Sequence, residues 1–211
     1  MLLSVMTLRL AVLGDSIGFG IGATRTADTL APRLVAALVA AGLPADARVF
    51  AVPGARSADL GRQVTSVAAW RPDLALIVIG ANDLTHFVPA EQAAASLGRA
   101  VRSLRELGAQ VLIAPAPDLS IVPHVPPPMR PLVQAASMLL RQAQIRATLA
   151  HGGRIADPDA ATAAAFATDP SLFCHDRFHP SSAGYTLIAQ ALTPAVLAAA
   201  GEIAAAGRTS G

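Results

Sequence analysis

The chain has 211 residues, a formal net charge of +2, a hydrophobic fraction of 53% and one cysteine, Cys174. This length predicts one domain over 1–211, with a core large enough to fold without disulfides. The sixteen basic residues are scattered arginines, which argues against a nucleic-acid-binding face, and no stretch approaches the roughly 20 strongly apolar residues of a membrane span.

The first residues, MLLSVMTLRLAVL, are apolar but do not have the pattern of a secretory signal peptide. They lack a basic region, Arg9 interrupts them, and no small-residue cleavage site precedes the GDS that follows. We therefore expect a ragged N-terminus over 1–7 with Met6 as an alternative initiator, a flexible tail over 201–211, a cytoplasmic location, and a monomer or weak homodimer.

The predicted elements alternate between strand and helix along the chain. Near-continuous apolar runs predict buried strands at 8–14, 48–54, 74–80 and 110–117, with a weaker fifth at 154–158. Helical periodicity and end signals predict helices at 28–41, 57–69, 89–107 and 129–150, and from Pro180 onward with a break at Thr193-Pro194. This alternation predicts a three-layer α/β/α domain with a central parallel sheet of about five strands.

Open parallel sheets bind ligands at the carboxyl ends of their strands. The residues that follow the first four predicted strands are Gly14-Asp15-Ser16, Gly54-Ala55-Arg56, Gly80-Ala81-Asn82-Asp83 and Pro117-Asp118. We expect these segments to share one rim, with the proline-rich segment 120–131 as a loop over it. From its position alone, Asp118 is a candidate substrate contact.

Ser16 is a candidate nucleophile, and it needs a neighbouring base to take its proton. Of the five histidines, we favour His179, which lies in Asp176-Arg177-Phe178-His179-Pro180, three residues after an acid and directly before a predicted helix. At this spacing Asp176 can hold the far ring nitrogen and stabilise the imidazolium. The backbone amides of Ser16 and Gly54 and the side-chain amide of Asn82 are candidate oxyanion donors.

In this order, the GDS, the glycine after the second strand, the G-x-N-D and the late D-x-x-H resemble the SGNH (GDSL-type) hydrolases. The resemblance runs from residue 14 to 179 and implies a flavodoxin-like fold. It also implies hydrolysis of esters, thioesters or lysophospholipids through an acyl-serine, without metal or other cofactor. It gives Ser16 as nucleophile, His179 and Asp176 as base and orienting acid, and Ser16, Gly54 and Asn82 as the oxyanion hole. This chain has GDSI where leucine is common.

Other interpretations compete with this one. An acyltransferase would use the same site with another acceptor. A nucleotide-binding module could use Gly18, Gly20 and Gly22, although their spacing is alternating instead of G-x-G-x-x-G. Gly14 to Gly18 also fits the G-x-S-x-G elbow, but too few residues precede Ser16 for that fold. The Cys and His residues at 174–179 lack a second pair of ligands at zinc spacing, so no metal site is predicted.

Overall fold

A computed structural model describes residues 7–209, so Met6 and the rest of 1–6, like 210–211, lie outside the described residues. A five-stranded parallel sheet has the order β2-β1-β3-β4-β5. Its strands are β1 Leu8–Gly14, β2 Ala45–Val49, β3 Leu74–Val78, β4 Gln110–Ala114 and β5 Arg154–Ile155. The α-helices are α1 Ser16–Phe19, α2 Leu30–Ala40, α3 Leu60–Ala68, α4 Ala81–Thr85, α5 Ala90–Glu106, α6 Arg130–Ala150, α7 Asp159–Thr168 and α8 Ser182–Thr209.

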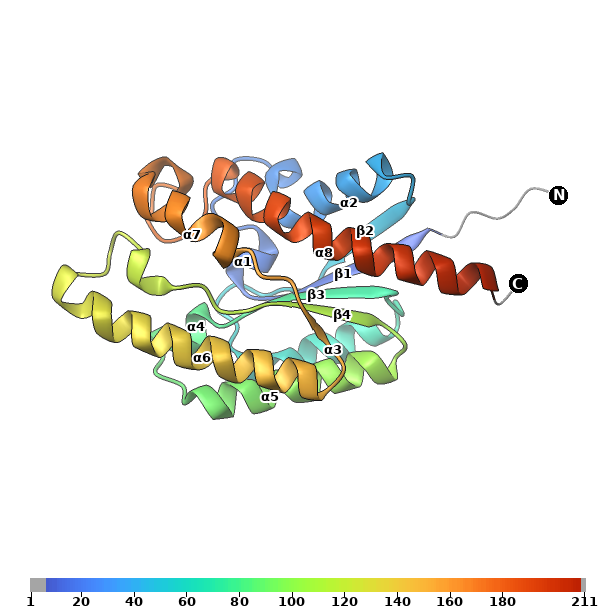
Figure 1. The fold of residues 1–211 in the computed structure, drawn as a ribbon, viewed down its shortest axis with the longest axis horizontal. Helices are drawn as coiled ribbons and strands as arrows, with labels where there is room; N and C mark the ends of the chain where they lie inside the picture. Colours follow the sequence, from blue (N-terminus) through green and yellow to red (C-terminus); the bar gives the residue numbers. More distant parts are fainter. Residues whose placement is uncertain (1–6, 210–211) are drawn as a thin grey trace.

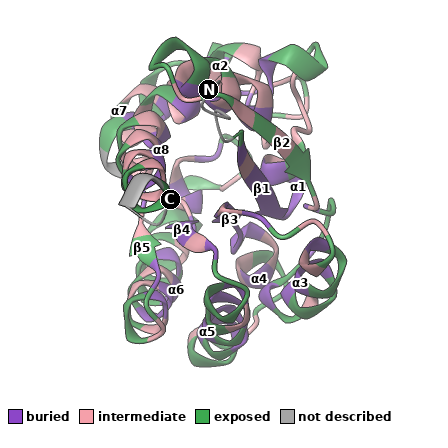
Figure 2. Ribbon diagram, turned by 90° about the vertical axis from the view of Figure 1, so that its right-hand side faces the viewer, coloured by how far each residue is buried: buried purple, intermediate pink, exposed green. Residues whose placement is uncertain are grey.

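The helices cover both faces of the sheet, as predicted for a three-layer fold. In Figure 1, α2, α7 and α8 lie on one side and α3 to α6 on the other. Side chains alternate along β1, so Leu10 and Val12 join the core under α2 and α8, whereas Ala11 and Leu13 join the core over α3 and α5. Figure 2 shows the buried residues concentrated along the sheet and on the inner sides of the helices.

The second strand differs from its prediction. It was expected at 48–54 from the apolar run there, but β2 occupies Ala45–Val49. Because β2 is an edge strand whose residues are exposed or half-buried, it does not need a continuous apolar sequence. The segment after it instead forms a rim loop, in which Phe50 and Ala51 donate to Val12 O and Val52 donates to Gly14 O.

The expected break at Thr193-Pro194 is also wrong, because α8 passes through Pro194 without interruption. Pro194 is exposed, while Leu192 and Val196 on either side of it are buried in the core. Packing of both halves against the sheet therefore offsets the lost backbone hydrogen bond. The helix also includes residues 201–209, which the sequence analysis assigned to a tail.

Length and hydropathy alone would allow α8 to cross a membrane. It is the one helix within residues 7–209 with a sufficiently long apolar window, whose mean hydropathy is 1.5. The sequence does not predict such a stretch, because the apolar character of α8 comes from alanines instead of bulky side chains. In the structure Tyr185, Leu192, Val196 and Ala199 of α8 pack in the core with α2 and the sheet. Core helices and membrane spans share this length and hydropathy.

Candidate active site

Ser16, His179 and Asp176 lie together at the carboxyl end of the sheet, although 163 residues separate the serine from the histidine. His179 Nε2 lies 2.9 Å from Ser16 Oγ. On the other side of the ring, Nδ1 lies 2.6 Å from Asp176 Oδ2. The imidazole therefore joins the hydroxyl and the carboxylate in a continuous chain of hydrogen bonds.

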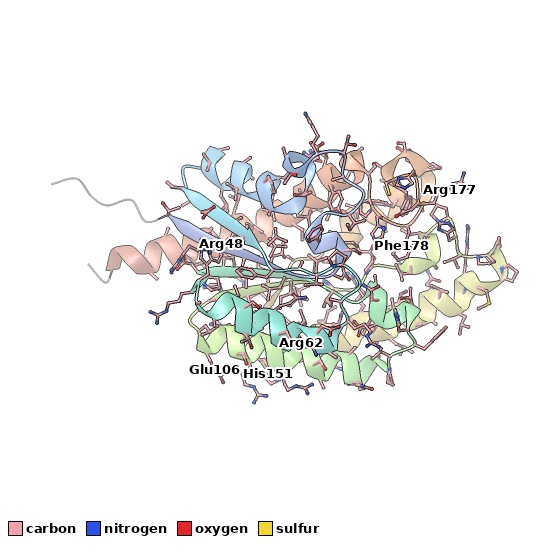
Figure 3. All side chains as sticks on the ribbon, turned by 180° about the vertical axis from the view of Figure 1, so that it is seen from behind. Arg48, Arg62, Glu106, His151, Arg177 and Phe178 are labelled. Carbon is pink, nitrogen blue, oxygen red and sulfur yellow. The ribbon has the colours of Figure 1, made fainter. Side chains whose placement is uncertain are left out.

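A tight loop after Phe173 positions both the acid and the base. Cys174 donates its backbone N–H to His179 O, which closes the loop, and Asp176 Oδ1 accepts the backbone N–H groups of Phe178 and His179. The ring of Phe178 also meets the His179 ring edge-on, with centroids 5.1 Å apart. Figure 3 shows Phe178 and Arg177 at the end of the molecule opposite Arg48.

The electrostatics of this loop favour an ionised Asp176. Burial alone would raise the pKa of this carboxyl, but the hydrogen bonds from the His179 ring and from the two backbone N–H groups outweigh burial and lower it. Cys174 Sγ adds a fourth donor, 3.1 Å from Asp176 Oδ1. Asp176 can therefore hold the His179 ring in one tautomer and stabilise its protonated form.

The alternating glycines after Ser16 serve close packing in this structure. Gly20 ends the short helix α1 with a φ of 105°. Gly22, with a φ of 94°, lies where a Cβ would come within 2.4 Å of Pro180 O and 3.1 Å of both Cys174 Sγ and His179 Cβ. The absent side chain thus lets the loop that carries Ser16 approach the loop that carries His179. Tyr185 Oη, which donates to Ile21 O at 2.7 Å, holds the same two segments together.

Gly54 lies in the loop after β2 and Asn82 lies in the short helix α4, and a buried acid of α4 joins the two segments. Asp83, which is 1% exposed, accepts the backbone N–H and the hydroxyl of Ser57, at 3.1 and 2.8 Å. Asn82 Nδ2 donates to Ala55 O at 3.1 Å, and this leaves its second N–H for another acceptor. Gly54 has a φ of 80°, a backbone conformation that side chains disfavour.

Two buried glutamines support the rim, and the sequence analysis missed both. Gln63 of α3 pairs with both backbone groups of Gly14, with each hydrogen bond 2.8 Å long. Gln144 of α6 accepts from Ala116 N and donates to Ile79 O, and so bridges the segments that follow β4 and β3. Each side chain replaces sheet hydrogen bonds where the strands separate. For Gln63 the signal in the sequence was an amide on an otherwise apolar helix face, whereas Gln144 shares its buried face with Ser137 and Thr148.

Asp15 is a second buried acid of the rim. It is 1% exposed, and burial raises its pKa to about 7 against the hydrogen bond from Ile17 N. The nearby Asp83 carboxyl raises the pKa further. Asp15 caps α1 and therefore fixes the backbone of the residue next to it, Ser16.

Asp118 lies on the same rim but is engaged with its own loop. Its Oδ1 accepts from Ser120 N at 2.8 Å, and its Oδ2 accepts from Gln134 Nε2 at 3.3 Å. It also lines an apolar cavity beside the site. Within residues 7–209, no group of three or more His, Cys, Asp or Glu side chains is arranged to hold a metal ion.

Comparisons of the sequence with known proteins find GDSL-like proteins. The sequence matches the GDSL-like Lipase/Acylhydrolase family over residues 12–187. It is 34% identical over 192 residues to a GDSL-like esterase of Mycobacterium tuberculosis, an alignment that covers 87% of this chain and 60% of that protein. The chain therefore spans about three fifths of the length of this curated relative.

Two solved structures illustrate the likeness of fold. TesA matches with a TM-score of 0.76 and 20% identity, over 90% of this chain and 99% of that chain. A variant of an acetylxylan esterase from Geobacillus stearothermophilus matches with a TM-score of 0.69 and 22% identity, over 91% of this chain and 96% of that chain. At these identities the likeness is one of fold.

Proposed function

Because this chain belongs to the GDSL-like lipase/acylhydrolase family, we propose that it is a serine esterase that cleaves carboxylic esters through an acyl-serine intermediate. The observation that carries the proposal is the 2.9 Å contact between Ser16 Oγ and His179 Nε2, with Asp176 at 2.6 Å on the far side of the ring. An activated serine needs this arrangement of nucleophile, base and orienting acid.

In the first half of the reaction, Ser16 Oγ attacks the ester carbonyl carbon and its proton passes to His179 Nε2. The tetrahedral intermediate then collapses, the bond to the alcohol oxygen breaks, and His179 returns the proton to the departing alcohol. In the second half, water attacks the acyl-serine while His179 takes a proton from it. Ser16 recovers its proton as the carboxylic acid leaves, so Asp176 stays ionised throughout.

The oxyanion that forms on the carbonyl needs fixed donors. The backbone N–H of Ser16 lies in the first turn of α1, where N–H groups have no partner within the helix. Asn82 has a second side-chain N–H beyond the one held by Ala55 O. With the backbone N–H of Gly54, these groups form the proposed oxyanion hole.

Steady-state hydrolysis of p-nitrophenyl esters tests the proposal. Replacement of Ser16 by alanine should lower kcat by about 10⁶-fold, because the nucleophile is lost. His175→Ala is the matched control, since this exposed histidine is adjacent to Asp176 and makes no contact with Ser16 in the proposed mechanism. Wild-type turnover by Ser16→Ala would refute the mechanism.

Thioesters and lysophospholipids belong in the same assay, because an acyl-serine can form from each of them. An added alcohol separates hydrolysis from acyl transfer, since water and alcohol compete for the same acyl-serine. We expect free acid to remain the main product. Ester product in excess of acid at modest alcohol concentration would instead favour the acyltransferase.

A further inference from the structure

An apolar cavity of about 90 Å³ is lined by residues that neighbour Ser16 and His179 in the sequence. Ile17, the residue after Ser16, lines it together with Phe178 and Pro180, the residues on either side of His179. The carboxyl ends of β3 and β4 contribute Val78 and Ala114 to its wall. The cavity therefore shares part of its wall with the two segments that carry Ser16 and His179.

Helix α7 and the loop after β4 form the opposite part of the wall. Thr162 and Phe166 of α7 line the cavity, and the Phe166 ring meets Phe173, another lining residue, edge-on with centroids 5.2 Å apart. Leu119 and Val122 close it from the loop after β4. Leu119, Val122, Phe166 and Phe173 belong to a small hydrophobic cluster that is distinct from the two clusters formed around the sheet.

The surface that lines the cavity is almost entirely apolar, so the cavity favours an apolar ligand. Two acids line it, but both have partners in the protein. Asp118 accepts from Ser120 and Gln134, and Asp159 lies 3.9 Å from Arg141. A polar or charged group placed here would lose water without gaining a partner. A hydrocarbon chain would gain the free energy of apolar burial.

Resting on the proposed function, we propose that this cavity binds the acyl chain of the substrate and that Thr162 and Phe166 set the preferred chain length. An engineered cavity of about 150 Å³ holds benzene, with six carbons, so 90 Å³ corresponds to about four carbons beyond the carbonyl. The preferred substrates are then esters of unbranched acids of about four to six carbons, whereas an acetyl group would leave the cavity empty.

A series of p-nitrophenyl esters from acetyl to dodecanoyl tests this assignment on the full chain. Each added methylene should raise kcat/KM by about fourfold until the cavity is full, because burial of one methylene changes the free energy by a fixed increment. The profile should peak at butyryl to hexanoyl. A profile that is flat or highest at acetyl would overturn the inference.

Two substitutions should move the peak in opposite directions. Thr162→Phe fills the cavity and should lower kcat/KM for hexanoyl by at least tenfold while acetyl hydrolysis changes less than threefold. Phe166→Ala opens the wall and should shift the peak by two or more carbons toward longer chains. Leu104→Ala, a buried truncation in α5 away from the cavity, controls for lost stability and should keep the wild-type profile. Equal losses at every chain length in Thr162→Phe would contradict the assignment.

A second series keeps the acyl group as acetyl and lengthens the alcohol from ethyl to octyl. We expect a weak dependence on alcohol length that Thr162→Phe does not alter. A strong dependence that Thr162→Phe abolishes would assign the cavity to the alcohol and overturn the inference.

A binding measurement without turnover separates the two proposals. In the Ser16→Ala variant, hexanoate should raise the melting temperature, acetate should not, and the added Thr162→Phe substitution should abolish the effect. If hexanoate binds in this way but no ester of any length is hydrolysed, the proposed function fails and the cavity assignment holds. If esters are hydrolysed through Ser16 without hexanoate binding or chain-length preference, the assignment fails alone.

Discussion

The two sides of the proposed site are held together in different ways. On the base side, the loop that carries Asp176 and His179 reaches Ser16 from the far end of the sequence, and packing at Gly22 sets how closely they approach. On the oxyanion side, the loops after β2 and β3 are joined by buried hydrogen bonds from Ser57 to Asp83. The base side therefore depends on close packing at Gly22 together with the hydrogen bond from Tyr185 to Ile21, and the oxyanion side depends on the buried hydrogen bonds to Asp83.

This difference predicts how each side fails. A steric change on the base side should move the imidazole away from the hydroxyl, so the chemical step should slow at every substrate concentration. A change on the oxyanion side should leave the nucleophile competent while the intermediate becomes less stable. The substitutions below test the two sides in order of decreasing expected effect.

Loss of charge at the orienting acid should have the largest effect. Asp176→Asn keeps the size of the side chain but changes the acceptor at His179 Nδ1, so the imidazole takes the wrong tautomer and kcat should fall by about 10⁴-fold. Asp169 is an exposed acid in the preceding turn, so Asp169→Asn is the control for the loss of one negative charge. Similar kinetics for the two variants would show that Asp176 does not orient the base.

Loss of one oxyanion donor should have the next largest effect. Asn82→Ala should lower kcat by about 10²- to 10³-fold with little change in KM, because the lost hydrogen bond forms mainly in the transition state. Thr85→Ala, on the exposed side of the same helix, should have nearly wild-type kinetics. A higher KM with unchanged kcat in Asn82→Ala would instead indicate a role in substrate binding.

Steric fit on the base side is tested with a pair of glycines. Gly22→Ala introduces a Cβ against Pro180 and His179, whereas Gly108→Ala introduces one at a similar φ, 90° against 94°, with nothing within 4 Å. Backbone strain should cost each variant about 1 kcal/mol of stability, and Gly22→Ala should lose more because its Cβ meets the backbone oxygen of Pro180. Only Gly22→Ala should also lose activity, by about 10- to 100-fold, because the base is displaced. Equal activity losses would remove the steric account.

The last prediction concerns the pH dependence of folding stability instead of turnover. Because the folded-state pKa of Asp15 is raised to about 7, the folded chain holds a proton that the unfolded chain releases near pH 4. This acid therefore makes stability fall as the pH rises from about 4 to 7. In Asp15→Asn that contribution disappears, so its stability relative to wild type should increase over this range by up to about 1.4 kcal/mol per pH unit. Urea unfolding at several pH values measures it, and a constant difference would contradict the raised pKa.

The parts of the fold and site that carry strong local signals could be predicted from the sequence. The central strands β1, β3 and β4 are buried on both faces, so their apolar runs mark them clearly, and a polar segment follows each of them at the carboxyl end of the sheet. The spacing of Asp176 and His179 was informative, because a single turn of the chain brings the carboxylate next to the imidazole three residues later.

Other parts depended on tertiary context. The edge strand β2 has exposed residues and no continuous apolar run, and α7 is alanine-rich with little amphipathic contrast. The supporting glutamines Gln63 and Gln144 become meaningful only when strand ends lie beside them. Pro194 remains within a helix because the sheet holds the helix on both sides of it.

Labelling with a fluorophosphonate tests most directly whether Ser16 is activated by His179. We predict one covalent adduct per chain, located by mass spectrometry on the peptide that contains Ser16. Labelling should be lost in Ser16→Ala, slow in His179→Ala and unchanged in His175→Ala. No adduct on the wild-type chain, or one on another residue that persists in Ser16→Ala, would contradict the account.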